Sequence, residues 1–95
     1  MEGIKHQHKN NLLLYRRRMG FSQKHVARLL GHPNNEMLFR YERGRRLPPL
    51  MTALRLEIIY RVPVAFLYGR TYDAMREEVH HTEDGLRMPT QPVLF

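Results

Sequence analysis

The chain has 95 residues, which is enough for one domain with a modest hydrophobic core. It carries a formal net charge of +7 and no cysteine, so disulfide bridges and thiolate metal sites are excluded. No apolar run reaches the length of a membrane span, and the first residues lack the apolar segment of a signal peptide, so we expect a cytoplasmic protein.

The positive charge is concentrated in the first 70 residues. Residues 1–70 contain 14 Lys and Arg against 4 Asp and Glu, a net charge of +10, whereas residues 71–95 contain 2 against 5, a net charge of −3. A basic domain favours polyanions because it releases their counterions, whatever its fold. Ribosome-associated and membrane-surface proteins are basic too, so the charge alone does not identify DNA as the partner.

Residues 1–10 lack hydrophobic periodicity, and we predict that they form a flexible N-terminal arm. This arm contains His6 and His8, but no third or fourth metal ligand lies close to them in the pattern. The neighbouring His80 and His81 point in different directions on a helix, which makes a shared metal ion improbable. We therefore expect neither a metal nor any other cofactor.

The first predicted helix covers residues 11–19 and is capped by Asn10 or Asn11. Its inward face follows apolar residues at i, i+3 and i+7: Leu12, Tyr15 and Met19. Leu13 and Leu14 do not fit this face, so they either pack under a later helix, which we favour, or form part of an interface.

Residues 22–44 predict two short helices joined by a tight turn. Ser22 is a good N-cap for the first, since its hydroxyl accepts an amide hydrogen of the first turn. Apolar residues at i, i+3 and i+4 predict its inward face: Val26, Leu29 and Leu30. Gly31 suits the left-handed position that ends a helix, and Pro33 forbids continuation.

The second short helix is predicted to be capped by Asn34 or Asn35, to turn Leu38 and Tyr41 inward, and to end at Gly44. The loop after it begins with two arginines. Two short helices with a glycine-containing turn indicate a helix-turn-helix, and here the second helix is edged with arginine. We interpret this stretch as a DNA-binding unit.

A long apolar helix is predicted over residues 50–61. Its expected inward positions are Leu50, Ala53, Leu54 and Ile58. Because it is apolar nearly all round, it is central either to the core or to an oligomer contact. A further helical turn or two is expected at 65–68, stopped by Gly69, and a sixth helix at 72–80. The prediction is an all-α bundle over residues 11–80 with a flexible C-terminal tail, 81–95.

Three segments resemble the Cro/repressor-type helix-turn-helix family, also called XRE-family regulators. They are residues 20–23 (GFSQ), 26–31 (VARLLG) and 40–48 (RYERGRRLP), and the similarity covers roughly residues 11–68. The resemblance implies a bundle of about five helices that binds operator DNA, usually as a dimer, to regulate transcription.

The resemblance also implies roles for individual residues. Ala27 matches the small residue that lets the two helices approach closely, and Arg16 and Glu42 match a semi-buried salt bridge. The phosphate-binding set that it implies is Ser22, Gln23, Arg43, Arg45 and Arg46. The base-reading set on the outward face of the second helix is Asn35, Glu36, Phe39 and Arg40.

Two features depart from the family pattern. The turn is one residue longer than the commonest form, so the start of the recognition helix is left open. Phe39 occupies a position that is usually small or polar, and it either touches a thymine methyl group or, as we favour, leans against a neighbouring helix.

The favoured function is a sequence-specific transcriptional regulator, a repressor that binds double-stranded DNA at an inverted repeat as a homodimer. The surplus apolar surface predicts a dimer contact within residues 59–79. The alternative is an antitoxin or adapter that keeps the fold and acts mainly through a protein partner. We do not expect an enzyme, because the chain has neither a phosphate-cradling glycine loop nor a cysteine nucleophile.

Overall fold

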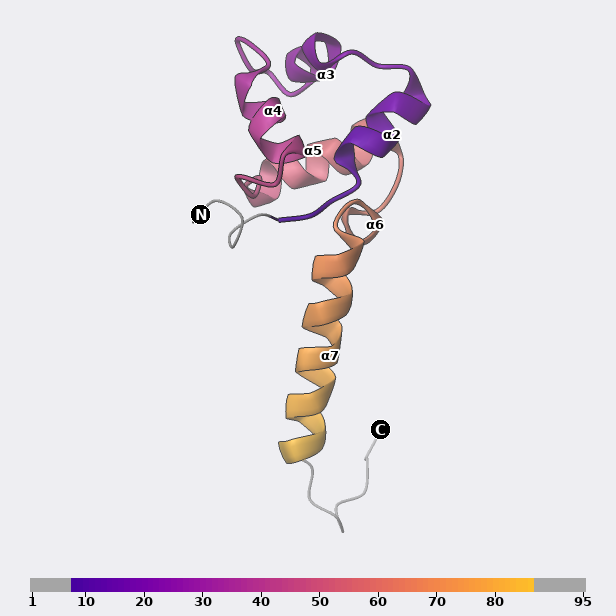
Figure 1. The fold of residues 1–95 in the computed structure, drawn as a ribbon, viewed down its shortest axis with the longest axis vertical. Coiled ribbons are helices and arrows are strands. Elements are labelled where there is room, and N and C mark those ends of the chain that lie inside the picture. Colours follow the sequence, from indigo (N-terminus) through magenta and orange to yellow (C-terminus); the bar gives the residue numbers. More distant parts are fainter. Residues whose placement is uncertain (1–7, 87–95) are drawn as a thin grey trace.

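The computed structural model describes residues 8–86. Within this part of the chain there are six helices and no strands: α2 (Leu12–Met19), α3 (Gln23–Leu29), α4 (Glu36–Glu42), α5 (Leu50–Tyr60), α6 (Val64–Leu67) and α7 (Gly69–Leu86). The predicted all-α fold is confirmed. In Figure 1, α2 to α6 form a head, and α7 leaves it beside α6 and projects away as a single rod.

The core of the head is built from apolar and tyrosine side chains of α2 to α6 and the residue after α6: Leu12, Val26, Leu30, Leu38, Tyr41, Leu56, Tyr60, Leu67 and Tyr68. Most of the inward positions expected on the first three helices are therefore correct. Leu29 is an exception, since half of it is exposed, and the small Ala27 is buried on α3 instead. On α2, Leu13 is half buried, whereas Leu14 is exposed.

The predicted inward face of α5 is wrong. Leu56 and Tyr60 are the buried residues of this helix, while Leu50, Leu54 and Ile58 are exposed by 71%, 43% and 73%. The helix is apolar on nearly every side, so hydrophobic periodicity does not select a face. Contacts with α2 and α6, which the local pattern does not encode, decide which side enters the core.

Two of the predicted glycine stops have the expected conformation. Gly31 and Gly44 have φ angles of 81° and 74°, in the left-handed region that glycine tolerates. Gly44 also lies against the chain at His8, where an added Cβ would stand 2.7 Å from the carbonyl oxygen of His8. A side chain at position 44 would therefore clash with backbone as well as strain its own.

Gly69 does not stop a helix, which corrects the prediction. The chain turns at Tyr68, and Gly69 is the first residue of α7, without a positive φ angle. A glycine ends a helix only when it adopts the left-handed conformation. The sixth helix is consequently longer than expected, running to Leu86, so residues 81–86 of the predicted tail are helical and residues 87–95 lie outside the described part.

The last residues of the predicted N-terminal arm are bonded to the end of α4. The backbone N–H of His8 donates to the carbonyl oxygen of Gly44 (2.6 Å), and Asn10 Nδ2 donates to the carbonyl oxygen of Tyr41 (2.9 Å). Residues 1–7, including His6, lie outside the described residues. Among the helices that the structure describes, none is long and apolar enough to cross a membrane.

Candidate nucleic-acid interface

The helix-turn-helix consists of α3, the turn at 30–35 and α4. Ser22 caps α3, since the backbone N–H of His25 donates to its Oγ atom (3.0 Å). Ala27 is 2% exposed where α3 packs against α4, and the N–H of His32 donates to its carbonyl oxygen (2.9 Å). The Asn34 side chain accepts the N–H of Glu36 (3.0 Å), so α4 begins at Glu36 despite the longer turn.

Three of the predicted base-reading residues lie on α4 and the fourth, Asn35, is its N-cap. All four are exposed: Asn35, Glu36, Phe39 and Arg40. Glu36 and Arg40 form an ion pair one helical turn apart, with 2.9 Å between Oε2 and Nη2. The Arg43 guanidinium lies 4.9 Å from the centroid of the Phe39 ring. Arg43, the C-cap of α4, thus covers part of the Phe39 ring, and the Phe39 side chain stays 38% exposed.

Arg16 of α2 and Glu42 of α4 form a two-pronged ion pair under this face. Arg16 Nε lies 2.5 Å from Glu42 Oε2, and Nη2 donates to Oε1 (3.2 Å). The two side chains are 13% and 5% exposed, and the remaining Nη1 donates to the carbonyl oxygen of Phe21 (3.0 Å). The hydrogen bond to Glu42 raises the pKa of Arg16 above its ordinary value, so the cation is permanent.

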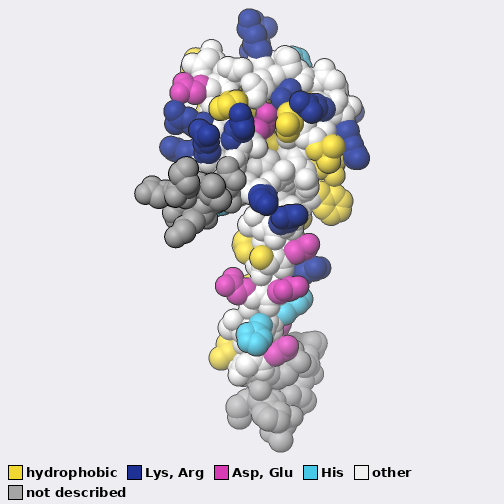
Figure 2. Space-filling view, in the orientation of Figure 1, with side chains coloured by type: hydrophobic (Ala, Val, Ile, Leu, Met, Phe, Trp, Pro, Cys, Tyr) yellow, Lys and Arg dark blue, Asp and Glu magenta, His cyan; other side chains and the backbone are white. Residues whose placement is uncertain are grey.

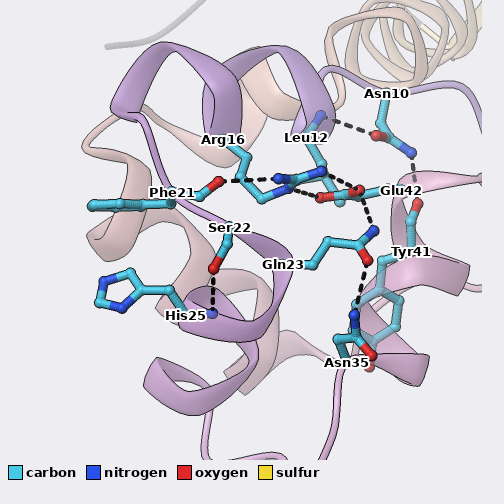
Figure 3. A network of polar contacts seen from close by, with 10 residues as sticks. All are labelled: Asn10, Leu12, Arg16, Phe21, Ser22, Gln23, His25, Asn35, Tyr41 and Glu42. Carbon is cyan, nitrogen blue, oxygen red and sulfur yellow. Dashed lines mark hydrogen bonds and ion pairs between the residues drawn. The ribbon is translucent and has the colours of Figure 1, made fainter.

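A chain of hydrogen bonds leads from this ion pair to the surface (Figure 3). Gln23 Nε2 donates to Glu42 Oε1 (2.9 Å), and Asn35 Nδ2 donates to Gln23 Oε1 (3.0 Å). Because a carboxylate only accepts, Glu42 requires the nitrogen of the Gln23 amide, which leaves the Gln23 oxygen for Asn35. Asn35 then keeps its own oxygen and one N–H free, the pair that recognises adenine.

Sequence reasoning missed this chain of contacts. It assigned Gln23 to a phosphate, which stays a prediction, and it did not foresee that the Gln23 side chain is bonded to Glu42 and Asn35, at separations of 19 and 12 residues. The family resemblance that paired Arg16 with Glu42 was the one available signal for these contacts, since it placed the Glu42 carboxylate behind the first turn of α3. The two amide orientations follow from that carboxylate.

The other predicted phosphate ligands surround this face. Ser22, Arg43, Arg45 and Arg46 are all exposed, and the last two follow the end of α4 in the loop before α5. Figure 2 shows Lys and Arg side chains gathered over the head and Asp and Glu side chains spread along α7. Within residues 8–86, no group of three His, Cys, Asp or Glu side chains is placed to hold a metal ion.

Comparison with known proteins agrees with this geometry. A family model described as helix-turn-helix matches residues 12–67, more than half of the chain, and ends just before α7. No curated protein and no solved structure matches the chain. The chain therefore belongs to the Cro/repressor-type (XRE) helix-turn-helix family of DNA-binding transcription regulators.

Proposed function

We propose that the protein is a repressor that binds an inverted-repeat operator as a homodimer. The observation that carries this proposal is the exposed row of Asn35, Glu36 and Arg40 on α4, with arginines in the loop beyond it. The row offers an amide, a carboxylate and a guanidinium, which between them recognise adenine, cytosine and guanine edges in the major groove.

Base reading and phosphate binding are assigned to different parts of this surface. Asn35, Glu36, Phe39 and Arg40 lie on one face of α4 and enter the groove, whereas Arg45 and Arg46 follow the helix and meet the backbone. Ser22, the N-cap of α3, and Arg43, the C-cap of α4, are exposed and contact phosphates as well. In this assignment Gln23 orients Asn35 in addition to facing the backbone.

Two copies are needed for selectivity. The recognition helix α4 has seven residues and touches only a few base pairs, too few to select one site in a genome. A two-fold dimer doubles the site and places its half-sites about one helical turn, roughly 34 Å, apart. Occupation of an operator that overlaps a promoter is sufficient for repression and requires no further contact.

Selection of bound sites from a random DNA pool tests this proposal. The expected result is a site with two-fold symmetry, bound by two subunits, whose half-sites share one sequence. Failure to enrich any sequence would contradict the DNA-binding assignment. Enrichment of an asymmetric site that binds one subunit would contradict the inverted repeat and the dimer.

A second candidate function, an adapter or antitoxin that acts through a protein partner, is favoured by one observation. The outer side of α5 exposes a row of large apolar side chains: Leu50, Met51, Leu54 and Ile58. Exposed apolar rows of this kind mark protein contacts. A gel shift with and without cell extract separates the two functions, since an adapter binds the selected site only when the extract supplies its partner.

A further inference from the structure

Among the residues that the structure describes, α7 has little support. None of its 18 residues is buried, and it meets the head at its beginning, beside α6. A helix of this length, about 27 Å, is marginally stable in water unless one of its faces is covered. Gly85 and Val79 have low helix propensity, so α7 depends even more on another surface packing against one of its faces.

Four apolar residues and one threonine on α7 alternate spacings of three and four, which is a repeat of 3.5 residues. We call this row the α7 seam: Tyr72, Met75, Val79, Thr82 and Leu86. The other positions of α7 hold charged or polar residues, two glycines and Ala74. A row with this period, here two heptads long on an otherwise polar helix, suits the contact face of a two-stranded coiled coil.

The seam is open along its length. Tyr72, Met75, Val79 and Leu86 are exposed by 48%, 55%, 63% and 77%. At the head it enters an apolar groove of about 420 Å³, whose walls include Leu47, Ala53 and Val64. Together with Leu47, the four exposed apolar seam residues offer on the order of 500 Å² per copy, so two copies bury about 1,000 Å² at most, the least that a specific interface needs.

We propose that the α7 seam pairs with the α7 seam of a second copy of this chain, in a parallel two-stranded coiled coil closed at its upper end by the grooves of the two heads. This proposal rests on the proposed function, in which two copies share one inverted repeat. The acidic side chains on the remainder of α7 exclude DNA as the cover. The seam lies outside the matched family region, residues 12–67.

The parallel direction follows from the position of the recognition helices. In Figure 1, α3 and α4 lie at the end of the molecule opposite to the tip of α7. Parallel pairing brings both α4 helices to the same end, as adjacent half-sites require. Antiparallel pairing would separate the two heads by the length of α7 and carry the two α4 helices to opposite ends of the dimer.

Association is tested by sedimentation of the full chain without DNA. The expected wild-type species at micromolar concentration is a dimer. Val79→Glu places a charge in the seam and is expected to weaken self-association at least about 100-fold, because the charge is buried without a partner. Ala74→Glu makes the same kind of change on the polar side of α7 and is expected to leave the dimer unchanged. A monomeric wild-type chain, or a Val79→Glu variant that still dimerises, would overturn the proposal.

Direction is tested by a single introduced cysteine, which is unique because the chain has none. Val79→Cys forms a disulfide-linked dimer on mild oxidation only if position 79 faces itself, as it does in parallel pairing. Ala74→Cys is the matched control and is expected to stay monomeric in denaturing gels. Cross-linking of the control but not of Val79→Cys would overturn the parallel seam.

A third variant makes use of charge. Parallel pairing sets Glu78 opposite Glu83 of the second copy, across the edge of the seam. Glu83→Arg converts two repulsions into two attractions and is expected to tighten the dimer about fivefold. Weaker association of this variant would contradict the parallel direction. If a monomeric chain binds DNA, the α7 seam is refuted and the DNA-binding function stands. If the chain dimerises but binds no DNA, the seam stands and the DNA-binding function is refuted.

Discussion

At the scale of single residues, the ion pair between Arg16 and Glu42 fastens α2 to the recognition helix. The side chains are 13% and 5% exposed, so removal of one charge strands the other in a poorly solvated place. Glu42→Ala is expected to lower the free energy of unfolding by about 3 kcal/mol, the lower end for a buried pair because Arg16 keeps some solvent contact. Urea denaturation measures the loss.

The double variant Arg16→Met with Glu42→Leu is the control for this prediction. It removes both charges and keeps apolar volume, so it is expected to cost much less than Glu42→Ala alone. Equal unfolding midpoints for Glu42→Ala and the parent would show that the ion pair contributes nothing to stability.

Gln23 provides a prediction about recognition, because its two hydrogen bonds orient Asn35. Gln23→Met keeps the length of the side chain and removes both bonds. Base preference at the position read by Asn35 is expected to fall about tenfold, within the roughly 1–3 kcal/mol of a bidentate contact. Competition between the selected site and its single-base variants measures this preference. A uniform loss of affinity for every sequence would instead make Gln23 only a phosphate ligand.

At the scale of elements, α4 and the loop after it are expected to respond differently to the loss of arginine. Arg40 shares the outward face of α4 with Glu36, whereas Arg45 and Arg46 lie beyond the helix. Arg40→Ala is expected to change the ranking of sites at one or two positions and leave non-specific binding nearly intact. The double variant Arg45→Ala with Arg46→Ala is expected to weaken matched and scrambled sites alike. An unchanged ranking for Arg40→Ala would place the base-reading set elsewhere.

The end of α5 and the junction between α6 and α7 each bury a tyrosine hydroxyl. Among the described residues neither Tyr60 nor Tyr68 has a hydrogen-bond partner for its hydroxyl. Burial raises the pKa of both hydroxyls above the ordinary value of 10.0, and the charge of Glu42 adds to the effect at Tyr60. Above pH 10 the unfolded chain therefore binds fewer protons than the folded one, so stability falls as the pH rises.

Each of these tyrosines is expected to contribute a slope of about 1.4 kcal/mol per pH unit to that decline. Tyr60→Phe removes one of the two contributions, and at pH 8 it is expected to be nearly neutral because the lost hydroxyl has no partner. Urea denaturation of parent and variant at pH 8 and pH 11 measures both effects. A parent whose stability is the same at the two values would contradict the prediction.

The helices also show which parts of the fold can be predicted from neighbouring residues in the sequence. Gly31, Gly44 and the cap at Ser22 act within one helical turn, so the ends of α3 and α4 and the outward face of α4 were predictable. The inward face of α5 was not, because its apolar residues surround the helix and distant contacts choose among them. The bond between Gln23 and Asn35 depends in the same way on the packing of α3 against α4.

At the scale of the whole molecule, the opposite charges of the head and α7 separate the DNA-binding end from the rest. If each subunit neutralises five to seven phosphates, the logarithm of the binding constant is expected to fall against the logarithm of the salt concentration with a slope of about −0.9 per phosphate. Titration of the selected site at several salt concentrations gives the slope. The double variant Arg45→Ala with Arg46→Ala is expected to flatten it by about two per subunit.

The control for this slope lies on α7. Glu77 and Asp84 are exposed and stand outside the α7 seam, about 12 and 22 Å along the helix from its start at 1.5 Å per residue. These distances exceed the screening length of about 8 Å at physiological salt. Glu77→Gln with Asp84→Asn therefore raises the net charge by as much as the arginine pair lowers it, yet it is expected to leave the slope unchanged. If the slope followed the net charge in both variants, DNA binding would depend on the charge of the whole chain. That result would contradict the assignment of α4 and its loop as the interface.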